Sequence, residues 1–259
     1  PQEDILVQDG LVFTPMYKVG PTLAALDEIT GRLRWVYGAM SASTPEEANI
    51  RFETAPAGGP QTVYAGYVLD NIEGDTHTDT EYGVMAFESV SGRVKWRRPV
   101  CTLRPGQFSA GFAVKRRNKI RSFLSPPLYH EGTIYYCTDA GAVAALDALS
   151  GRIKWVMRYP YYRRGHDSTL SLHESYYNPK PWYNQRPLLI GEQLYIMPVD
   201  STLFLCMDRR TGKVLWNRSK QMYGGSSNYF VGALSTGELV FVLNGRARQG
   251  YFNHGCGNT

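Results

Sequence analysis

Residues 145–155 read ALDALSGRIKW, and this stretch decides the fold because it occurs four times. The same pattern is found in ALDEITGRLRW at 25–35, AFESVSGRVKW at 86–96 and CMDRRTGKVLW at 206–216. The four copies align without a gap, and their tryptophans, at positions 35, 96, 155 and 216, lie 59 to 61 residues apart. Self-similarity at a fixed period indicates a repeat architecture in which each copy is one supersecondary unit.

Each copy predicts a β-hairpin. Apolar residues alternate on both sides of a short polar turn, as a strand–turn–strand unit requires. The Asp or Glu that opens the turn can accept backbone N–H groups two residues further on, and the Gly supplies the positive φ that closes the turn. Because side chains alternate along a strand, we expect the Trp to share a strand face with the apolar residue two positions before it, as Trp155 with Ile153.

A second pair of apolar runs precedes each hairpin. Three of these runs, each after a short turn that contains Gly, are Leu11–Phe13, Thr133–Cys137 and Gln193–Met197. Each period of about 60 residues therefore reads as four antiparallel strands, and four-stranded units that recur in this way are typical of a β-propeller. The sequence predicts an all-β fold of four-stranded antiparallel blades.

The pattern Ala-x-Asp-x-x-Thr/Ser-Gly-x-x-x-Trp resembles the blade repeat of pyrroloquinoline-quinone (PQQ)-type β-propellers of bacteria. That family includes the quinoprotein alcohol and glucose dehydrogenases and non-enzymatic relatives such as the propeller lipoprotein of the outer-membrane assembly machine. The resemblance covers all four copies and implies that the Ala, Gly and Trp are structural, with the Trp docked onto the next blade. The structural blade motif is then Ala25, Gly31, Trp35, Ala86, Gly92, Trp96, Ala145, Gly151, Trp155, Cys206, Gly212 and Trp216. Cys206 takes the place of the Ala, and we expect it to be a small buried hydrophobe.

The repeats predict a single partial propeller domain over residues 1–259. The blades are expected at about 1–36, 60–100, 126–158 and 187–218, with the start of a fifth at about 229–245. Family propellers usually have seven or eight blades, and an open array leaves raw strand edges. We therefore expect either a longer molecule or another chain that supplies the remaining blades. A compact closure of four blades is the less favoured alternative, because strands follow Gly237.

The long connections are expected on one side of the propeller. Strands alternate in direction, so the two kinds of short turn fall on one face, while the links between blades and the connections between second and third strands fall on the other. The links are 37–59, 97–125, 156–186 and 217–229, and residues 71–82 are expected as an extended loop. Long loops usually carry function, which makes this side the candidate binding surface.

Three features stand out on that side. A basic cluster runs through Lys115, Arg116 and Arg117 with Arg97 and Arg98 nearby, and it could dock an acidic protein, anionic lipid headgroups or a carboxylated ligand, or be a solvated loop. Tyr, Trp and Arg are enriched at interface anchors, although such rings can also pack onto the propeller rim; the candidates are Tyr161, Tyr162, Arg163, Arg164 and Trp182. The pairs His166-Asp167 and His173-Glu174 could bind a metal or act in acid–base chemistry, or be solvated.

Composition narrows the function classes. The net charge of +5 is too small for a dedicated nucleic-acid binder. No run of 18 apolar residues predicts a membrane span. The chain starts at Pro1 without an initiator Met, which indicates a mature form or a fragment. Cys101, Cys137, Cys206 and Cys256 form no C-x-x-C pair, so neither a zinc finger nor a thioredoxin-like motif is indicated.

The resemblance also defines what an enzyme of this family would require. Quinoprotein dehydrogenases hold the quinone with a disulfide between adjacent cysteines and a Ca²⁺ or lanthanide ion bound by Glu, Asn and Asp. This sequence has no adjacent cysteines, no haem-attachment C-x-x-C-H motif and no dense carboxylate cluster in its loops. These observations favour a non-catalytic scaffold that binds a protein partner.

By family resemblance the scaffold is extracytoplasmic, in the periplasm or cell envelope. The first alternative is a fragment of a periplasmic PQQ-dependent oxidoreductase, with PQQ and Ca²⁺ bound only if missing blades supply the ligands. A further alternative is a sensor domain attached to a kinase or a larger envelope protein.

Overall fold

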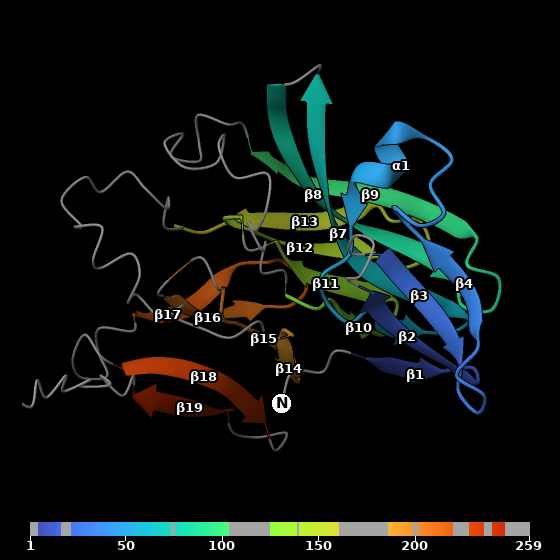
Figure 1. The fold of residues 1–259 in the computed structure, drawn as a ribbon. Coiled ribbons are helices and arrows are strands. Elements are labelled where there is room, and N and C mark those ends of the chain that lie inside the picture. Colours follow the sequence, from blue (N-terminus) through green and yellow to red (C-terminus); the bar gives the residue numbers. More distant parts are fainter. Residues whose placement is uncertain are drawn as a thin grey trace, which may run out of the picture.

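The computed structural model describes residues 5–16, 22–73, 76–103, 125–138, 140–160, 186–198, 201, 203–219, 228–235 and 240–246. These residues form five antiparallel sheets whose strands follow one another in sequence order (Figure 1). Three of these sheets contain four strands, the sheet of blade two contains five because β5 is added to its four blade strands, and the last sheet contains two. This confirms the prediction of a propeller with four blades and the start of another.

The strands of each blade are short except in blade two. Blade one contains β1 (Leu6–Gln8), β2 (Leu11–Met16), β3 (Thr22–Asp27) and β4 (Leu33–Tyr37). Blade two contains β5 (Ile50–Arg51), β6 (Ala57–Gly59), β7 (Thr62–Glu73), β8 (Thr76–Glu88) and β9 (Val94–Leu103). Blade three contains β10 (Leu128–His130), β11 (Thr133–Cys137), β12 (Ala142–Asp147) and β13 (Ile153–Arg158).

Blade four contains β14 (Leu188–Ile190), β15 (Gln193–Ile196), β16 (Leu203–Asp208) and β17 (Val214–Ser219). The fifth sheet contains β18 (Asn228–Ser235) and β19 (Val240–Arg246). Helix α1 (Pro45–Asn49) precedes β5. Within the described part of the chain, no helix is long and apolar enough to cross a membrane.

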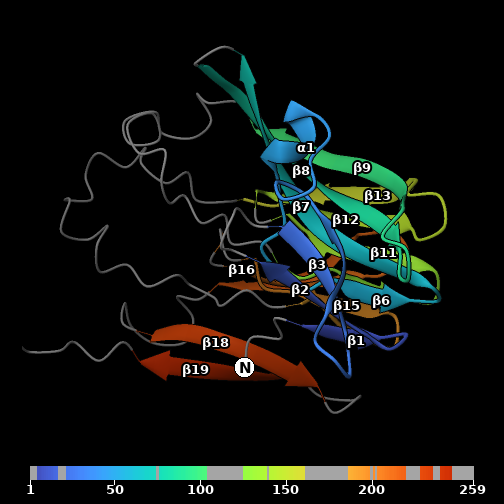
Figure 2. The same cartoon turned by 45° about the vertical axis from the view of Figure 1, so that its right-hand side comes forward.

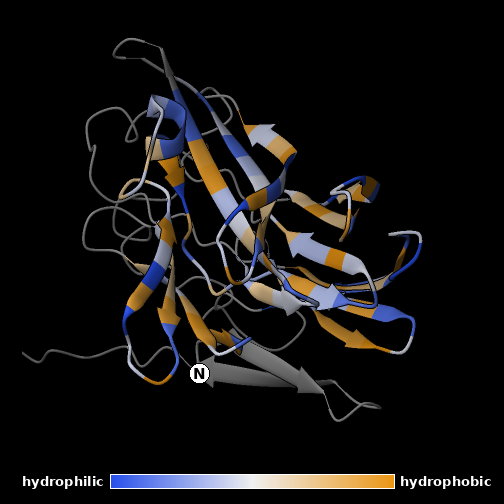
Figure 3. Ribbon diagram, turned by 90° about the vertical axis from the view of Figure 1, so that its right-hand side faces the viewer, coloured by the Kyte–Doolittle hydropathy of each residue, from blue (hydrophilic) through white to orange (hydrophobic). Residues whose placement is uncertain are grey.

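The first strands of the blades lie at the centre of the array. Strand β6 contacts both β1 and β10, and β18 contacts β14, so at these three junctions the first strands of consecutive blades are neighbours; Figure 2 shows β6 beside β1. The stacked rings of Tyr64 and Tyr129, 5.6 Å apart, join blades two and three near this axis. The core therefore lies between blades, where bands of hydrophobic residues on adjacent sheets face one another (Figure 3).

The repeated turn has the predicted chemistry. In blade one the Asp27 carboxylate accepts the N–H groups of Ile29 and Thr30 at 3.2 and 2.8 Å, and the φ of Gly31 is +66°. The backbone N–H of Glu28 bonds to the carbonyl of Gly10, so this turn lies beside the turn between the first two strands. The corresponding bond recurs in the other three blades, which confirms that both kinds of short turn share one face.

Each of the first three tryptophans contacts the turn of the next blade. The indole N–H groups of Trp35, Trp96 and Trp155 donate to the carbonyls of Ser89, Ala148 and Arg209 at 2.9, 3.1 and 2.9 Å. A Cβ placed on the Gly of each receiving turn would come within 2.5 to 2.7 Å of the indole ring. The small residue of the motif pairs directly with the Trp on the neighbouring strand, and Ala25, Ala86, Ala145 and Cys206 are all buried. A larger side chain there would compete with the indole for space.

The expectation that each Trp shares a strand face with the apolar residue two positions before it is wrong. Ile153 pairs with Leu146 and packs against the core between blades two and three, whereas Trp155 pairs with Ala145 and packs between blades three and four. The two side chains lie on opposite faces because a β-bulge places Lys154 without a partner in the ladder. An extra residue in one strand reverses the alternation beyond it, and the same register shift occurs in all four blades.

The expected loop at residues 71–82 is also wrong. Strands β7 and β8 are paired along their whole length, from Thr62 opposite Glu88 to Glu73 opposite Thr76. One β-bulge interrupts the register at Asn71. Blade two thus carries a long two-stranded ribbon that rises beyond the other blades, beside α1 (Figure 1). Thr76, Thr78, Thr80 and Tyr82 occupy every second position of β8, and Thr and Tyr favour a strand over a loop.

Candidate interaction site at the ribbon of blade two

The ribbon, defined as residues 68–73 of β7 and 76–82 of β8, is the main elaboration of the described residues on the side of the long connections. Near its base, β5 pairs with β7 at Val68 and Leu69, and β9 pairs with β8 as far as Thr80. Beyond these positions no described strand pairs with the outer edges of the ribbon. Within the described part of the chain, its distal backbone is paired only within the ribbon, and an unpaired strand edge is a template for another strand.

Arg97 of β9 organises the base of the ribbon. Its guanidinium forms ion pairs with Glu81 of β8, at 2.6 Å, and with Glu46 of α1. Its Nε donates to the hydroxyl oxygen of Tyr67 at 3.0 Å, and that hydroxyl donates to Glu81 at 2.5 Å. Burial opposes the charge of Arg97, but the bonds to Tyr67, Glu81 and Glu46 outweigh it and raise the pKa of the guanidinium. The ribbon and the helix are thus fixed by one permanent cation.

The Tyr67 ring lies under this cation because Gly83 leaves room for it. A Cβ on Gly83 would stand 2.6 Å from the ring of Tyr67 and would also clash with the carbonyl oxygen of Arg98. The Arg97 guanidinium carbon lies 5.0 Å from the ring centroid, close enough for a cation–π contact. Burial, and then the bond to Glu81, raise the pKa of Tyr67, so its hydroxyl stays protonated and acts as a donor.

Helix α1 is held at its start by a variant of the capping box, in which the Glu47 carboxylate reaches the residue before the N-cap. The Thr44 hydroxyl accepts the N–H of Glu47 at 3.2 Å, and the Glu47 carboxylate accepts the N–H of Ser43 at 2.7 Å. Pro45 occupies the first turn, where a missing N–H costs nothing. These local contacts orient Glu46 toward Arg97, and the Thr-x-x-Glu pattern is the sequence signal that could have identified the helix.

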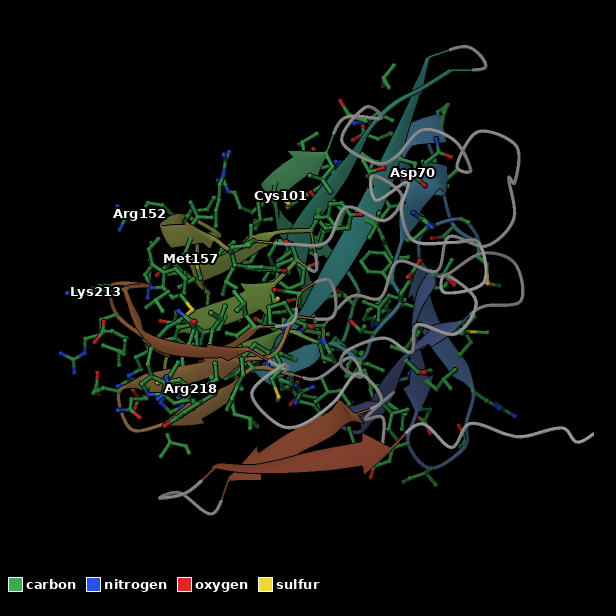
Figure 4. The ribbon with its side chains drawn as sticks, turned by 90° about the vertical axis from the view of Figure 1, so that its left-hand side faces the viewer. Asp70, Cys101, Arg152, Met157, Lys213 and Arg218 are labelled. Carbon is green, nitrogen blue, oxygen red and sulfur yellow. The ribbon has the colours of Figure 1, made fainter. Side chains whose placement is uncertain are left out.

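A second polar group stiffens the middle of the ribbon. Arg51 of β5 forms ion pairs with Asp70 at 2.8 Å and with Glu53 at 3.4 Å. The Thr80 hydroxyl donates to Asp70 across the strands at 2.9 Å, and the Asn71 amide donates to Asp79. Asp70 lies on the ribbon, away from the turns that carry Arg152 and Lys213 (Figure 4). Cross-strand polar pairs of this kind stabilise a two-stranded ribbon.

Of the predicted partner-binding residues, only Arg97 and Arg98 lie among the described residues. Arg97 binds the ribbon base, and Arg98, which faces the opposite side of β9, donates to the carbonyl of Gly151 in blade three at 2.9 Å. Partner binding by these two residues stays a prediction, but both side chains already have intramolecular roles. The other candidates lie outside the described residues: Lys115, Arg116, Arg117, Tyr161, Tyr162, Arg163, Arg164 and Trp182. The pairs His166-Asp167 and His173-Glu174 lie outside them as well.

The four carboxylates that are paired with Arg97 and Arg51 do not fit a quinone-bound Ca²⁺. Such an ion takes six to eight oxygen ligands that converge on one point. Here Glu46 and Glu81 are paired with Arg97, and Asp70 and Glu53 with Arg51, so each carboxylate already faces a cation of the same chain. Across the described ranges, no three His, Cys, Asp or Glu side chains are grouped so as to hold a metal ion.

A family model described as outer membrane protein assembly factor BamB matches residues 2–218. The chain belongs to the BamB family. Among solved structures, this BamB-family chain is similar to BamB from Moraxella catarrhalis, at 16% identity and a TM-score of 0.52, over 94% of this chain and 63% of that one. It is also similar to a europium-containing methanol dehydrogenase, at 14% identity and a TM-score of 0.52, over 85% of this chain and 41% of that one.

At these identities the structural matches show the fold alone. The BamB-family chain spans about 63% of the length of the Moraxella protein. No curated protein sequence matches it. Both structural relatives are consistent with PQQ-type blades, because a methanol dehydrogenase and an assembly factor share the propeller.

Proposed function

We propose that this BamB-family chain is a non-catalytic propeller scaffold that binds a protein partner on the side of the long connections, through the ribbon of blade two. It would act outside the cytoplasm as part of a larger protein or complex. By its family, the partner is expected among proteins that assemble the outer membrane. The proposal depends chiefly on one observation. Arg97 fixes the base of the ribbon through its ion pairs, while no described strand pairs with the distal edges of the ribbon.

The mode of binding that this geometry favours is strand addition. Main-chain groups on a free strand edge provide affinity, and side chains that point to alternate faces provide specificity. A ribbon fixed before binding loses little conformational entropy when a partner strand pairs with it. Residues 70–81 contain Asp70, Glu73, Asp75, Asp79 and Glu81 but no Lys or Arg. A partner at the ribbon is therefore expected to be basic or neutral, and an acidic partner remains the prediction for Lys115, Arg116 and Arg117.

Site-specific photo-crosslinking in the native cell envelope tests the proposal. A photoreactive residue at Thr78 on the ribbon should capture a defined protein, and the same residue at Arg152 on the short-turn face should not. Replacing residues 71–79 by a two-residue Asn-Gly turn, which keeps Asp70 opposite Thr80, should abolish capture from a second probe at Arg51 while leaving the melting temperature close to that of the parent chain. Equal capture from Thr78 and Arg152, or no capture from either, would refute the ribbon as the binding element.

The oxidoreductase alternative has its own test. The full-length protein is titrated with PQQ and Ca²⁺ and followed by absorbance. A scaffold should give no saturable spectral change, whereas a quinoprotein should give one with a stoichiometry near one.

A further inference from the structure

Large apolar residues are exposed at the tips of the repeated turns. The third residue of the turn is Ile29 in blade one, Val90 in blade two and Leu149 in blade three, and these residues are 95%, 65% and 90% exposed. Blade four has Arg210 at this position in a turn with the same hydrogen bonds to its opening Asp. The turn itself therefore does not require an apolar residue at its tip, and the three side chains are not needed for packing within their own blades.

The tips form an apolar band on the short-turn face, defined as the side of the molecule that carries both kinds of short turn. Leu33 and Val94, two residues after the Gly of their turns, extend the band. Together with the three tips they make up half of the ten exposed large hydrophobic residues in the described part of the chain. Apolar residues that are gathered in this way, rather than scattered singly, mark an interaction surface.

Two recesses occupy equivalent positions on this face. One lies between blades one and two and the other between blades three and four, and their volumes are about 320 and 280 Å³. Each could receive a side chain from outside, since one water molecule takes up about 30 Å³. The charged residues that line the first recess are Asp9, Asp27, Glu28 and Arg34. Those that line the second are Lys154, Arg209 and Arg210.

The net charge of the turns has opposite signs at the two ends of the band. The short turns of blade one, residues 8–10 and 27–34, contain three carboxylates and two guanidinium groups, which leaves a net charge of −1. The equivalent turns of blade four, residues 190–192 and 208–215, contain two carboxylates and three cations, which leaves +1. Counted in the same way, the turns of blade two have a net charge of +1 and those of blade three have none.

This pattern is complementary to itself. A two-fold axis that lies parallel to the face and passes between blades two and three would place blade one of one copy opposite blade four of a second copy. It would also place blade two opposite blade three, so that Val90 faces Leu149 and Ile29 faces Arg210. The acidic recess of each copy would then cover the basic recess of the other, and no two turns with the same net charge would meet.

We propose that the short-turn face is the contact surface of a symmetric dimer of this chain. A second copy is favoured over an unrelated protein because the face matches itself in the spacing of its recesses, in its charges and in the positions of its apolar residues. The ribbon of each copy lies on the side of the long connections and would remain free, so the dimer goes beyond the proposed function and does not depend on it.

Sedimentation equilibrium of the 259-residue chain tests the proposal. Between about 5 and 500 µM it should show a reversible equilibrium of monomer and dimer with a Kd in the micromolar range, as expected for a small contact made by turns. Val90→Asp and Leu149→Arg should each raise this Kd by about tenfold or more, because each variant buries a charge against an apolar side chain of the second copy.

A mixture of the two variants identifies the pairing. In a mixed dimer the new carboxylate at position 90 of one chain would face the new guanidinium at position 149 of the other, and the second Val90–Leu149 contact would be intact. The mixture should therefore dimerise at concentrations at which each variant alone is a monomer. Val156→Asp is the matched control, because Val156 is 53% exposed in the middle of β13 and should dimerise like the parent. Circular dichroism of each variant verifies the fold.

Three results would overturn the proposal. One is a parent chain that is still monomeric at about 500 µM. Another is a dimer that neither Val90→Asp nor Leu149→Arg weakens, and a third is a mixture that associates no better than its components.

The result is separable from that of the ribbon. Arg152 lies on the short-turn face, at the same edge of the molecule as Lys213 (Figure 4). A photoreactive residue there should join two copies of the chain, giving a product of twice its mass, and should not capture the protein that is captured at Thr78. Capture at Arg152 of a protein with another mass, by a chain that stays monomeric, would assign the face to a different partner and refute the dimer.

Discussion

The backbone carbonyl of Arg209 accepts the indole N–H of Trp155 at 2.9 Å, while the Arg209 guanidinium forms ion pairs with Glu131 and Glu192 at 3.1 and 2.8 Å. One residue of blade four is therefore joined to blade three by its main chain and by its side chain. A similar arrangement with fewer bonds joins blades one and two. The Ser89 carbonyl accepts the indole N–H of Trp35, and the Ser89 hydroxyl donates to the Asp9 carboxylate at 2.6 Å. Adjacent blades are connected at their turns as well as through their apolar faces.

Replacing Trp155 tests how much the indole contributes to the junction. Trp155→Ala should lower the free energy of unfolding by about 3–5 kcal/mol, because it removes a large ring packed between blades three and four. Trp155→Phe should lose less, since part of the ring contact remains and about 1 kcal/mol of hydrogen bonding is removed. Urea unfolding followed by circular dichroism measures both. A loss below about 1 kcal/mol for the Ala variant would contradict a docking role.

Two glycines at the same turn position separate backbone strain from ring contact. Gly31 and Gly151 have φ values of +66° and +69°, but they differ in surroundings, because a Cβ at Gly151 would lie 2.7 Å from the indole of Trp96 and one at Gly31 would meet nothing within 4 Å. Gly31→Ala should cost about 1–2 kcal/mol from the left-handed backbone alone. Gly151→Ala should cost about 1–3 kcal/mol more, because the methyl group overpacks the junction. Urea unfolding of both variants makes the comparison, and equal losses would show that the ring contact contributes nothing.

The sequence was sufficient for the hairpin and the blade, and insufficient for the ribbon. The turn could be predicted because Asp27, Thr30 and Gly31 interact within five residues, where each residue type has one main role. The β-bulge could not be predicted, because the number of residues between Gly and Trp is the same whether or not Lys154 has a partner in the ladder. The base of the ribbon could not be predicted either, since Arg97 meets Tyr67, Glu81 and Glu46 over separations of 16 to 51 residues.

The ion pairs of Arg209 predict sensitivity to acid. Hydrogen bonds from Arg209, and then from Arg210, lower the pKa of Glu192 to about 2. A carboxyl whose pKa is lower in the folded than in the unfolded state contributes stability above its unfolded pKa of about 4.3, and this is lost as the pH falls toward the folded value. The melting temperature of the parent chain should therefore fall more steeply between about pH 4.3 and pH 2 than that of Glu192→Gln. Parallel curves would contradict the ion-pair assignment.

Arg97 should stabilise the ribbon more than the neighbouring Arg98 does, because Arg97 bonds to the ribbon base and Arg98 bonds to blade three. Arg97→Ala should leave the partly buried Glu81 carboxylate without its cation, and each lost hydrogen bond to a charged group costs about 1.5–3 kcal/mol. Hydrogen exchange should accelerate at residues 45–49 and 76–81, because α1 and β8 are both bound to this guanidinium. Arg97→Lys should restore the charge but not the three-way contact, since an ammonium lacks the planar fork.

Arg98→Ala is the matched control for this change. It removes one exposed side chain from the same strand and one hydrogen bond, to the Gly151 carbonyl, so stability should fall by about 1 kcal/mol or less. Exchange at the ribbon should stay at the parent rate, because Arg98 faces blade three. If Arg98→Ala loosens the ribbon as much as Arg97→Ala does, the ribbon is held by the general stability of blade two, and the specific role of the Arg97 cation is refuted.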